Sequence, residues 1–158
     1  MAAIAERPLV GQECHLYYNT GDRTTPVLVE ITRAINVNAS IPFGEAEIAS
    51  RLSQWKTKRQ TTRELEITFT YQKKGGTDAV LVVLLAASTA GTVMDIWMLD
   101  GALAETGSQG PRMYCQVFDE TLGQDLEAVE EIEFVAKATY YETGGSPVDP
   151  DWYVVPTP

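Results

Sequence analysis

The chain has 158 residues, of which 44% are hydrophobic and 22% are charged, and its formal net charge is −10. This length and composition are typical of one ordinary soluble domain that can bury a core. The longest apolar run, residues 79–87, is too short to cross a bilayer, and the N-terminus lacks the long apolar core of a secretory signal. We therefore expect the protein to be made and folded in the cytoplasm, with no membrane partner.

The charge is divided unevenly along the chain. Residues 1–79 carry a net charge of +1, whereas residues 80–158 carry −11. A basic run at residues 51–63 contains no acid, and residues 119–133 contain seven acids and no base. These segments are either two solvated surfaces or the complementary halves of a head-to-tail interface between copies of the chain. A chain this acidic is a poor general binder of nucleic acid.

Hydrophobic alternation predicts a mainly β protein with two packed antiparallel sheets, in the form of a β-sandwich or barrel. The clearest alternation is at residues 64–72, where Leu65, Ile67 and Phe69 share one face and polar residues the other, as in a half-buried strand. Residues 27–37 predict one long strand with a largely apolar face. The remaining predicted strands are residues 13–19, 92–100, 112–120 and 127–142.

Two segments predict irregular structure. Residues 38–62 lack any period and predict a long loop between strands, which needs a reason in a compact domain. Residues 143–158 are rich in Gly and Pro and predict an arm without regular structure. Both contain large apolar residues that should pack on something, and we expect those of the arm to dock on a neighbouring molecule. These residues are Ile48, Leu52 and Trp55 in the loop, and Trp152 and Tyr153 in the arm.

Residues 77–90 suit either a buried strand or a helix. Thr77 or Asp78 could cap a helix at its start, and Gly91 fits the position just after its end. The segment is apolar on all sides, so a helix here would have to be well covered. Residues 101–111 follow the next predicted strand as a glycine-rich loop.

No catalytic or metal-binding set is recognisable. His15 is the only histidine, and no GxSxG turn supplies a nucleophile. Residues 107–110 look like a phosphate loop but lack the Lys-Ser/Thr that should follow. Cys14 and Cys115 stand among apolar residues, which suits buried thiols and not zinc ligands. We therefore expect no enzyme activity and no cofactor.

The order of short motifs between residues 53 and 112 carries a family resemblance. The stretch SQWKTKRQ precedes the strand RELEITFTYQ, an apolar segment ends in AASTAGT, and DIWMLDG is followed by the glycine loop GSQGPR. This layout resembles the tail tube proteins of long-tailed bacteriophages. The resemblance favours the helix for residues 77–90, as one flanking helix. It also implies a single tail-tube-like domain at residues 1–142, followed by the arm.

The resemblance implies a structural subunit of a virion tail, with six-membered rings that stack into a tube through which DNA passes without specific binding. It implies that the subunit binds itself, a tape-measure protein and the tail terminator or distal tail proteins. Residues 38–62 would be a long loop or hairpin that reaches the adjacent ring. The candidates for lining the lumen are Glu64, Glu66, Glu131 and Glu133. The candidates for contacts between subunits or rings are Ile48, Arg51, Leu52, Trp55, Lys56, Lys58, Arg59, Trp152 and Tyr153.

Two other functions fit the same sequence. A tube protein of a type VI or contractile injection system would share the architecture and lack the phage tape-measure partner. A monomeric β-sandwich that binds a ligand or serves as an adhesin would instead expose an aromatic cleft, built from Trp55, Trp97 or Trp152.

Overall fold

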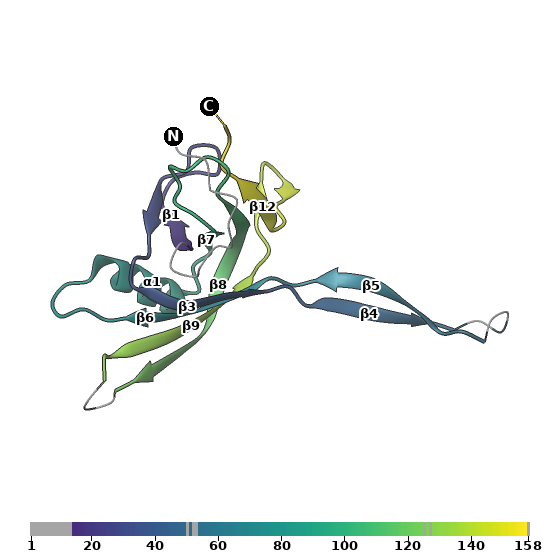
Figure 1. Ribbon diagram of the computed structural model, residues 1–158, viewed down its shortest axis with the longest axis horizontal. Coiled ribbons are helices and arrows are strands. Elements are labelled where there is room, and N and C mark those ends of the chain that lie inside the picture. Colours follow the sequence, from purple (N-terminus) through teal and green to yellow (C-terminus); the bar gives the residue numbers. More distant parts are fainter. Residues whose placement is uncertain (1–13, 50, 52–53, 125, 127, 158) are drawn as a thin grey trace.

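The chain forms a curled antiparallel sheet with a helix at its flank and a long hairpin that projects from it (Figure 1). The computed structural model describes residues 14–49, 51, 54–124, 126 and 128–157. The class expected from the sequence, mainly β with one helix, is confirmed. The elements are β1 (His15–Asn19), β2 (Leu28–Glu30), β3 (Ala34–Ser40), β4 (Phe43–Ile48), β5 (Thr57–Arg63), β6 (Glu66–Gln72), α1 (Ala79–Ala90), β7 (Met94–Leu99), β8 (Gln109–Gly123), β9 (Glu131–Ala138), β10 (Glu142–Thr143), β11 (Ser146–Pro147) and β12 (Asp151–Val154).

One sheet contains most of the strands. Their order is β2-β1-β7-β8-β9-β6-β3, and β12 pairs with the first part of β8. β2 and β3 lie at opposite edges of this sheet although only residues 31–33 separate them, so the sheet curls until its edges approach each other. The two expected sheets are therefore two halves of one curled sheet. Two small sheets, β4–β5 and β10–β11, complete the described structure.

The prediction of one strand at residues 27–37 is wrong, because within this segment the chain crosses from one edge of the sheet to the other. The amide of Ile31 donates to the carbonyl of Leu16 at 2.8 Å, and the amide of Ala34 donates to the carbonyl of Ile31 at 3.2 Å. This turn ends β2 and begins β3, which pairs with β6 on the far side of the sheet. The alternation of apolar and polar residues continues across the turn, because Ile31 before it and Val37 after it both pack on the same core. The sequence pattern therefore does not reveal the turn.

The core fills the inside of the curl. Alternate residues of β6 point into it, and Phe69 stacks on Phe134 of β9 with ring centroids 5.3 Å apart. Ile96 of β7 and Leu84 of α1 join the same cluster from the other sides, and all four side chains are at most 1% exposed. The inward row expected for β6 is confirmed, and β9 buries alternate residues in the same way. Each large side chain buried here contributes about 1.5–3 kcal/mol, so this cluster holds the two halves of the sheet together.

β7 is apolar on both faces because both faces are covered. Met94 and Ile96 point into the main core. Trp97 and Leu99 point the other way, into a second cluster with Tyr17 of β1. The C-terminal segment covers this second cluster, with the ring of Tyr153 4.5 Å from that of Trp97 between centroids.

The predicted helix is confirmed together with its caps. The Asp78 carboxylate accepts a hydrogen bond from the amide of Leu81 at 3.3 Å, and Gly91 ends the helix with a φ of 63°, in the left-handed region that glycine tolerates. The second Asp78 oxygen accepts from the Tyr71 hydroxyl at 2.7 Å, which joins the helix to β6. The expected full cover is not found within one chain, since Val82 is 60% exposed.

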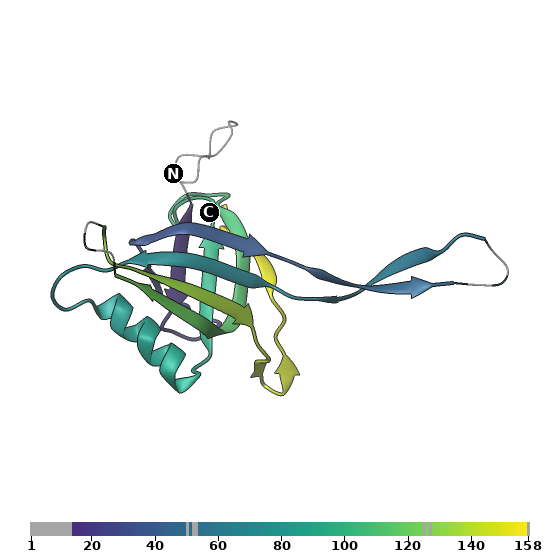
Figure 2. The ribbon, with the colours of Figure 1, turned by 90° about the horizontal axis from the view of Figure 1, so that it is seen from below.

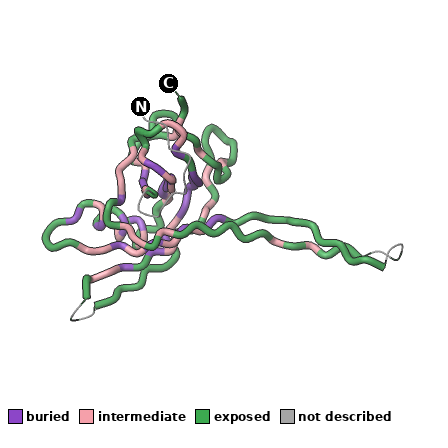
Figure 3. Tube along the Cα trace, in the orientation of Figure 1, coloured by how far each residue is buried: buried purple, intermediate pink, exposed green. Residues whose placement is uncertain are grey.

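The predicted loop at residues 38–62 is wrong, and most of it forms a hairpin. β4 pairs with β5 from Phe43 to Ile48, and the hairpin runs on past the ends of β3 and β6 (Figure 2). All of β5 is exposed, and the hairpin is green along most of its length in Figure 3. Because the chain covers neither of its faces, the hairpin lacks the period of two that marks a half-buried strand. It agrees with the hairpin form that the resemblance implied.

The C-terminal region is more regular than the sequence predicted. β8 begins at Gln109, inside the expected glycine loop, and a Cβ at Gly110 would collide with the carbonyl oxygen of Met98. Asp151–Val154 then forms β12, which pairs antiparallel with residues 109–112 of β8. Tertiary pairing, which the local sequence does not encode, turns this part of the arm into a strand.

We predict that Asp78→Ala lowers the free energy of unfolding by about 1–3 kcal/mol, because it removes the helix cap and the partner of the buried Tyr71 hydroxyl. Burial alone raises the pKa of Asp78, but its hydrogen bonds to Tyr71 and the backbone outweigh this and hold the pKa below its ordinary value. The stabilisation should therefore be present above the ordinary pKa and be lost as the pH falls through the lowered one. Urea unfolding at several pH values measures this. Asp119→Ala, at an exposed site, serves as the control, and equal losses in both variants would contradict the role of the cap.

Candidate functional site

The second half of β8, together with β9, β6 and β3, forms a four-stranded segment with two unpaired edges (Figure 2). Residues 112–115 of β8 pair with β7, whereas residues 115–123 pair with β9 on the other side. Within the described chain, no strand pairs with the β7 side of residues 116–123, nor with the outer side of β3. Backbone donors and acceptors along such edges are templates for pairing with another chain.

Each of these two edges carries a β-bulge. The β8–β9 register shifts between Val117 and Asp119, and the β3–β6 register shifts between Ile35 and Asn38. Asn36, in the second bulge, has a φ of 51°, which is uncommon for a residue with a side chain. Bulges disturb the regular ladder, so these edges are poor templates for an arbitrary strand.

The face of this segment that points away from the core is acidic. Directly paired residues share a face, so the pairing of Thr70 with Glu133, of Gln72 with Glu131 and of Glu66 with Lys137 places three lumen candidates on it together. Asp119 of β8 shares this face through its pairing with Val135. Lys137 is the one base among these residues, with its Nζ 3.5 Å from a Glu66 oxygen. Glu64 lies just before β6 and lines a hollow of about 530 Å³ at the root of the hairpin.

The hairpin carries the basic candidates, but its lysines already have partners. Lys58 lies 2.6 Å from Glu45, and Lys56 lies 2.8 Å from Glu47, each across the hairpin. Arg51 and Arg59 make no ion pair with the residues that the structure describes. The apolar candidates Ile48 and Trp55 are 50% and 81% exposed, whereas Leu52 lies outside the described residues.

The two aromatic candidates of the arm behave differently. Tyr153 packs on Trp97 of its own chain. Trp152 points to the other side, is 60% exposed, and donates from Nε1 to the Gln109 side chain at 2.9 Å. Of the two, Trp152 is the one with surface to offer to another molecule.

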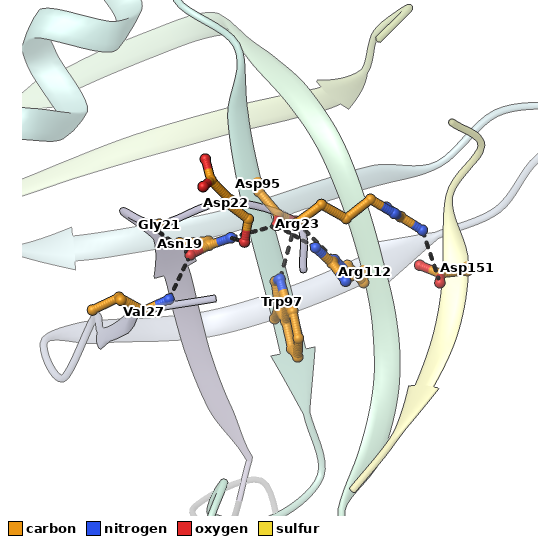
Figure 4. A network of polar contacts seen from close by, with 9 residues as sticks. All are labelled: Asn19, Gly21, Asp22, Arg23, Val27, Asp95, Trp97, Arg112 and Asp151. Atoms are coloured by element: carbon orange, nitrogen blue, oxygen red, sulfur yellow. Dashed lines mark hydrogen bonds and ion pairs between the residues drawn. The ribbon is translucent and has the colours of Figure 1, made fainter. Parts of the chain in front are cut away.

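A buried polar network joins β1, β7 and β8, and sequence reasoning missed it (Figure 4). Asp95 accepts from Arg112 through Nε at 3.1 Å and Nη2 at 2.7 Å, and from Trp97 Nε1 and Asn19 Nδ2 at 3.0 Å each. Burial by itself lowers the pKa of Arg112, but its bonds to Asp95 raise that pKa above the ordinary value. The signal was present in the sequence, since Asp95 is the one charged residue in its apolar strand.

This network is built to hold strands and not to do chemistry. Every acceptor site of Asp95 is occupied, and the guanidinium of Arg112 lies 4.3 Å from the centre of the Trp97 ring. Arg23 extends the network to β12, since its Nη2 lies 3.6 Å from a carboxylate oxygen of Asp151. In the described part of the chain no group of residues could hold a metal ion, and no helix is long and apolar enough to cross a membrane.

Solved structures of tubular assemblies share this architecture, although no family model and no curated protein matches the sequence. A chain of the SPP1 tail tube superposes with a TM-score of 0.70 at 14% identity, over 95% of this chain and 81% of its own length. The chain has the tail-tube fold. A chain from the tail of the empty gene transfer agent particle superposes with a TM-score of 0.63 at 12% identity, over 89% of this chain and 98% of its own length. A chain from the PVC sheath–tube complex, an extracellular contractile injection system, superposes with a TM-score of 0.63 at 11% identity, over 95% of this chain and 94% of its own length. The resemblance read from the sequence is thus confirmed for the fold.

We predict that Arg112→Met lowers the free energy of unfolding by about 3–5 kcal/mol, because it leaves the buried Asp95 carboxylate without its charged partner. Lys137→Met is the matched control: it breaks the half-exposed pair with Glu66 and should cost no more than about 1 kcal/mol. Chemical denaturation measures both losses, and emission from the buried Trp97 reports the local packing. Similar losses in the two variants would show that the network is not the main tie between β7 and β8.

Proposed function

We propose that this protein is the structural subunit of a tail tube, and that copies join edge to edge into rings that stack into a hollow tube. The observation that carries the proposal is the four-stranded segment β8–β9–β6–β3 with an unpaired edge on each side. Such a segment is incomplete alone and becomes complete when β3 of one copy pairs with β8 of the next. The tail-tube fold supports the same conclusion.

The strand directions suit closure into a ring. Three antiparallel steps separate β3 from β8, so the two edge strands run in opposite directions. A copy rotated about an axis roughly along the strands therefore brings its β8 antiparallel to β3 of the first copy. Each seam repeats the same contact, and a closed ring leaves no edge exposed. The number of copies expected from the resemblance is six.

In such a ring the acidic face lines the inside. The opposite face of the segment carries the core and the rest of the body, so the body lies outside the barrel wall. A lumen bearing Glu66, Glu131 and Glu133 would repel the phosphates of DNA, which would then slide without binding. Glu64, at the end of the segment near the hairpin root, would lie toward one mouth of the ring.

The hairpin suits contacts between stacked rings. It continues past the ends of β3 and β6, hence roughly along the axis of the proposed ring (Figure 2). Lys56 and Lys58 stabilise the hairpin itself, which leaves Arg51 and Arg59 to meet acids of the next ring. Exposed ion pairs contribute only about 0.2–1 kcal/mol each, so burial of Ile48 and Trp55 would supply most of the stability of the stack.

The remaining partners follow from the same proposal. A phage tube subunit would be assembled in the host cytoplasm, end up in the virion tail, and contact a tape-measure protein and terminator or distal tail proteins. The fold shared with the contractile injection assembly supports a second candidate, a tube that delivers a cargo other than a genome. A monomeric binding module is the third candidate, and it fails to account for the two unpaired edges.

The first test is assembly. We expect the purified chain to form rings or open-ended tubes in negative-stain images, with a matching high-mass fraction on size exclusion. Trp55→Ala should give folded subunits that form rings but stack poorly, because its exposed indole would be a main contact between rings. A stable monomer at high micromolar concentration, with no polymer in the images, would sink the proposal.

The second test concerns the lumen. A helical reconstruction of the tubes should place Glu66, Glu131 and Glu133 on the inner wall, and the double variant Glu131→Lys, Glu133→Lys should retain short duplex DNA inside at low salt because its lumen would attract phosphates. The same reversal at Glu142 and Asp149, both outside the four-stranded segment, is the control. A map with the three glutamates on the outer wall would refute the assignment while leaving the tube itself intact.

A further inference from the structure

α1 has an outer face that one chain leaves uncovered. None of its 12 residues is charged, and only Leu81, Leu84 and Ala87 are buried. Val82 and Val83 are 60% and 38% exposed. The other exposed positions of the helix are Ala79, Ala86 and Ala90, which are small, and Thr89, whose hydroxyl donates to the Leu85 carbonyl at 2.9 Å. We call this set the helix face, and a helix surface of this kind normally lies against another surface.

A hollow lies at the opposite side of the sheet, between its two edge strands. It has a volume of about 560 Å³ and is lined by the start of β1, the turn after β2, and the first half of β3. Its apolar lining includes Leu16, Ile31, Ala34, Ile35 and Val37, and Glu30 and His15 contribute polar groups. We call it the seam hollow.

The fold places these two surfaces on the two sides that would meet at a ring seam. In Figure 2 the strands follow one another as β3, β6, β9 and β8, and α1 lies beyond β8, on the side away from β3. The seam hollow includes residues of β3 itself. When β3 of one copy pairs with β8 of the next, the helix of the second copy therefore comes to the hollow of the first.

The two surfaces also lie at the same level along the strands. Tyr71 binds Asp78 at the start of α1, and Tyr71 is paired with Ala34, which lines the hollow. The polar groups of the hollow already pair with each other, since His15 Nδ1 lies 2.5 Å from Glu30 Oε1. The remaining lining of the hollow is mostly apolar, so the two surfaces match in apolar character and in level.

We propose that the helix face of one copy seats in the seam hollow of the neighbouring copy in the same ring, as the second contact of each seam beside the β3–β8 pairing. This inference rests on the proposed function, and its occupant is a second copy of this chain. Strand pairing sets the direction of the seam, and the apolar helix contact stabilises it.

The first experiment adds a charge to the helix face. Val82→Glu should raise the critical concentration for assembly roughly tenfold or more, because the seam would then bury a carboxylate without a partner. Val27→Glu is the matched control, since Val27 is 58% exposed and lies outside the hollow lining. Circular dichroism should show that both variants fold. Unchanged assembly of Val82→Glu, or equal loss in both variants, would overturn the proposal.

The second experiment uses the native thiols. The expected burial is wrong for Cys14, which is exposed and lines the seam hollow. It is confirmed for Cys115, whose burial raises the pKa of the thiol to about 12, so Cys115 should not react. In assembled Val82→Cys, a short bismaleimide should join the introduced thiol to Cys14 of the next copy and give a ladder of multiples that ends at the ring size. Adding Cys14→Ser should abolish the ladder.

The outcomes separate the two proposals. If the wild-type chain forms no ring or tube, the proposed function fails. If tubes form and the ladder is absent, or persists without Cys14, the tube stands and the helix contact is wrong.

Discussion

The unpaired backbone edges of the β8–β9–β6–β3 segment are the constraint on which the rest of the structure depends. The sheet curls around one core but does not close. β2 and β3 are its two edge strands, and β8 extends beyond the part that pairs with β7. The hydrogen-bonding groups left along β3 and residues 116–123 can be satisfied by water in a monomer or by a second copy. In the proposed ring, the second solution would also cover the apolar helix face. The edges of each chain would then be completed by its neighbours.

Hydrophobic and polar contacts stabilise the subunit in different ways. The Phe69–Phe134 cluster joins the two halves of the curled sheet without directional demands. The Asp95–Arg112 pair, by contrast, fixes how β7, β8 and β1 align, because a bidentate guanidinium tolerates little displacement. We infer that this buried pair contributes more to a defined arrangement of the strands than to net stability. In the proposed ring, where the edges of neighbouring subunits must match, assembly would depend on that alignment.

The charged surface residues fall into two groups, one on the four-stranded segment and one on the hairpin. Acids gather on the outward face of the four-stranded segment, where a channel would require them, and the hairpin balances its own lysines with Glu45 and Glu47. The strong contrast between the basic and acidic parts of the sequence is therefore weaker in space than along the chain. Within the basic run, Arg51, Arg59 and Arg63 make no ion pair with the described residues, and Arg63 lies over the ring of Phe43.

The sequence by itself determined the elements whose signals are local. The alternation of β6 was predictable, because burial on one face leaves a fixed period of two. The capping residues around Ala79–Ala90 were recognisable too, but the segment also suited a buried strand, and the resemblance decided for the helix. The β4–β5 hairpin left no period because nothing covers it, and the resemblance alone pointed to it. Only the tertiary structure decided the break after Ile31, the strand at Asp151–Val154, and the meeting of Asp95 with Arg112, since each depends on partners far away in the chain. The same holds for the unpaired edges, because an edge is a property of the whole sheet and of no single strand.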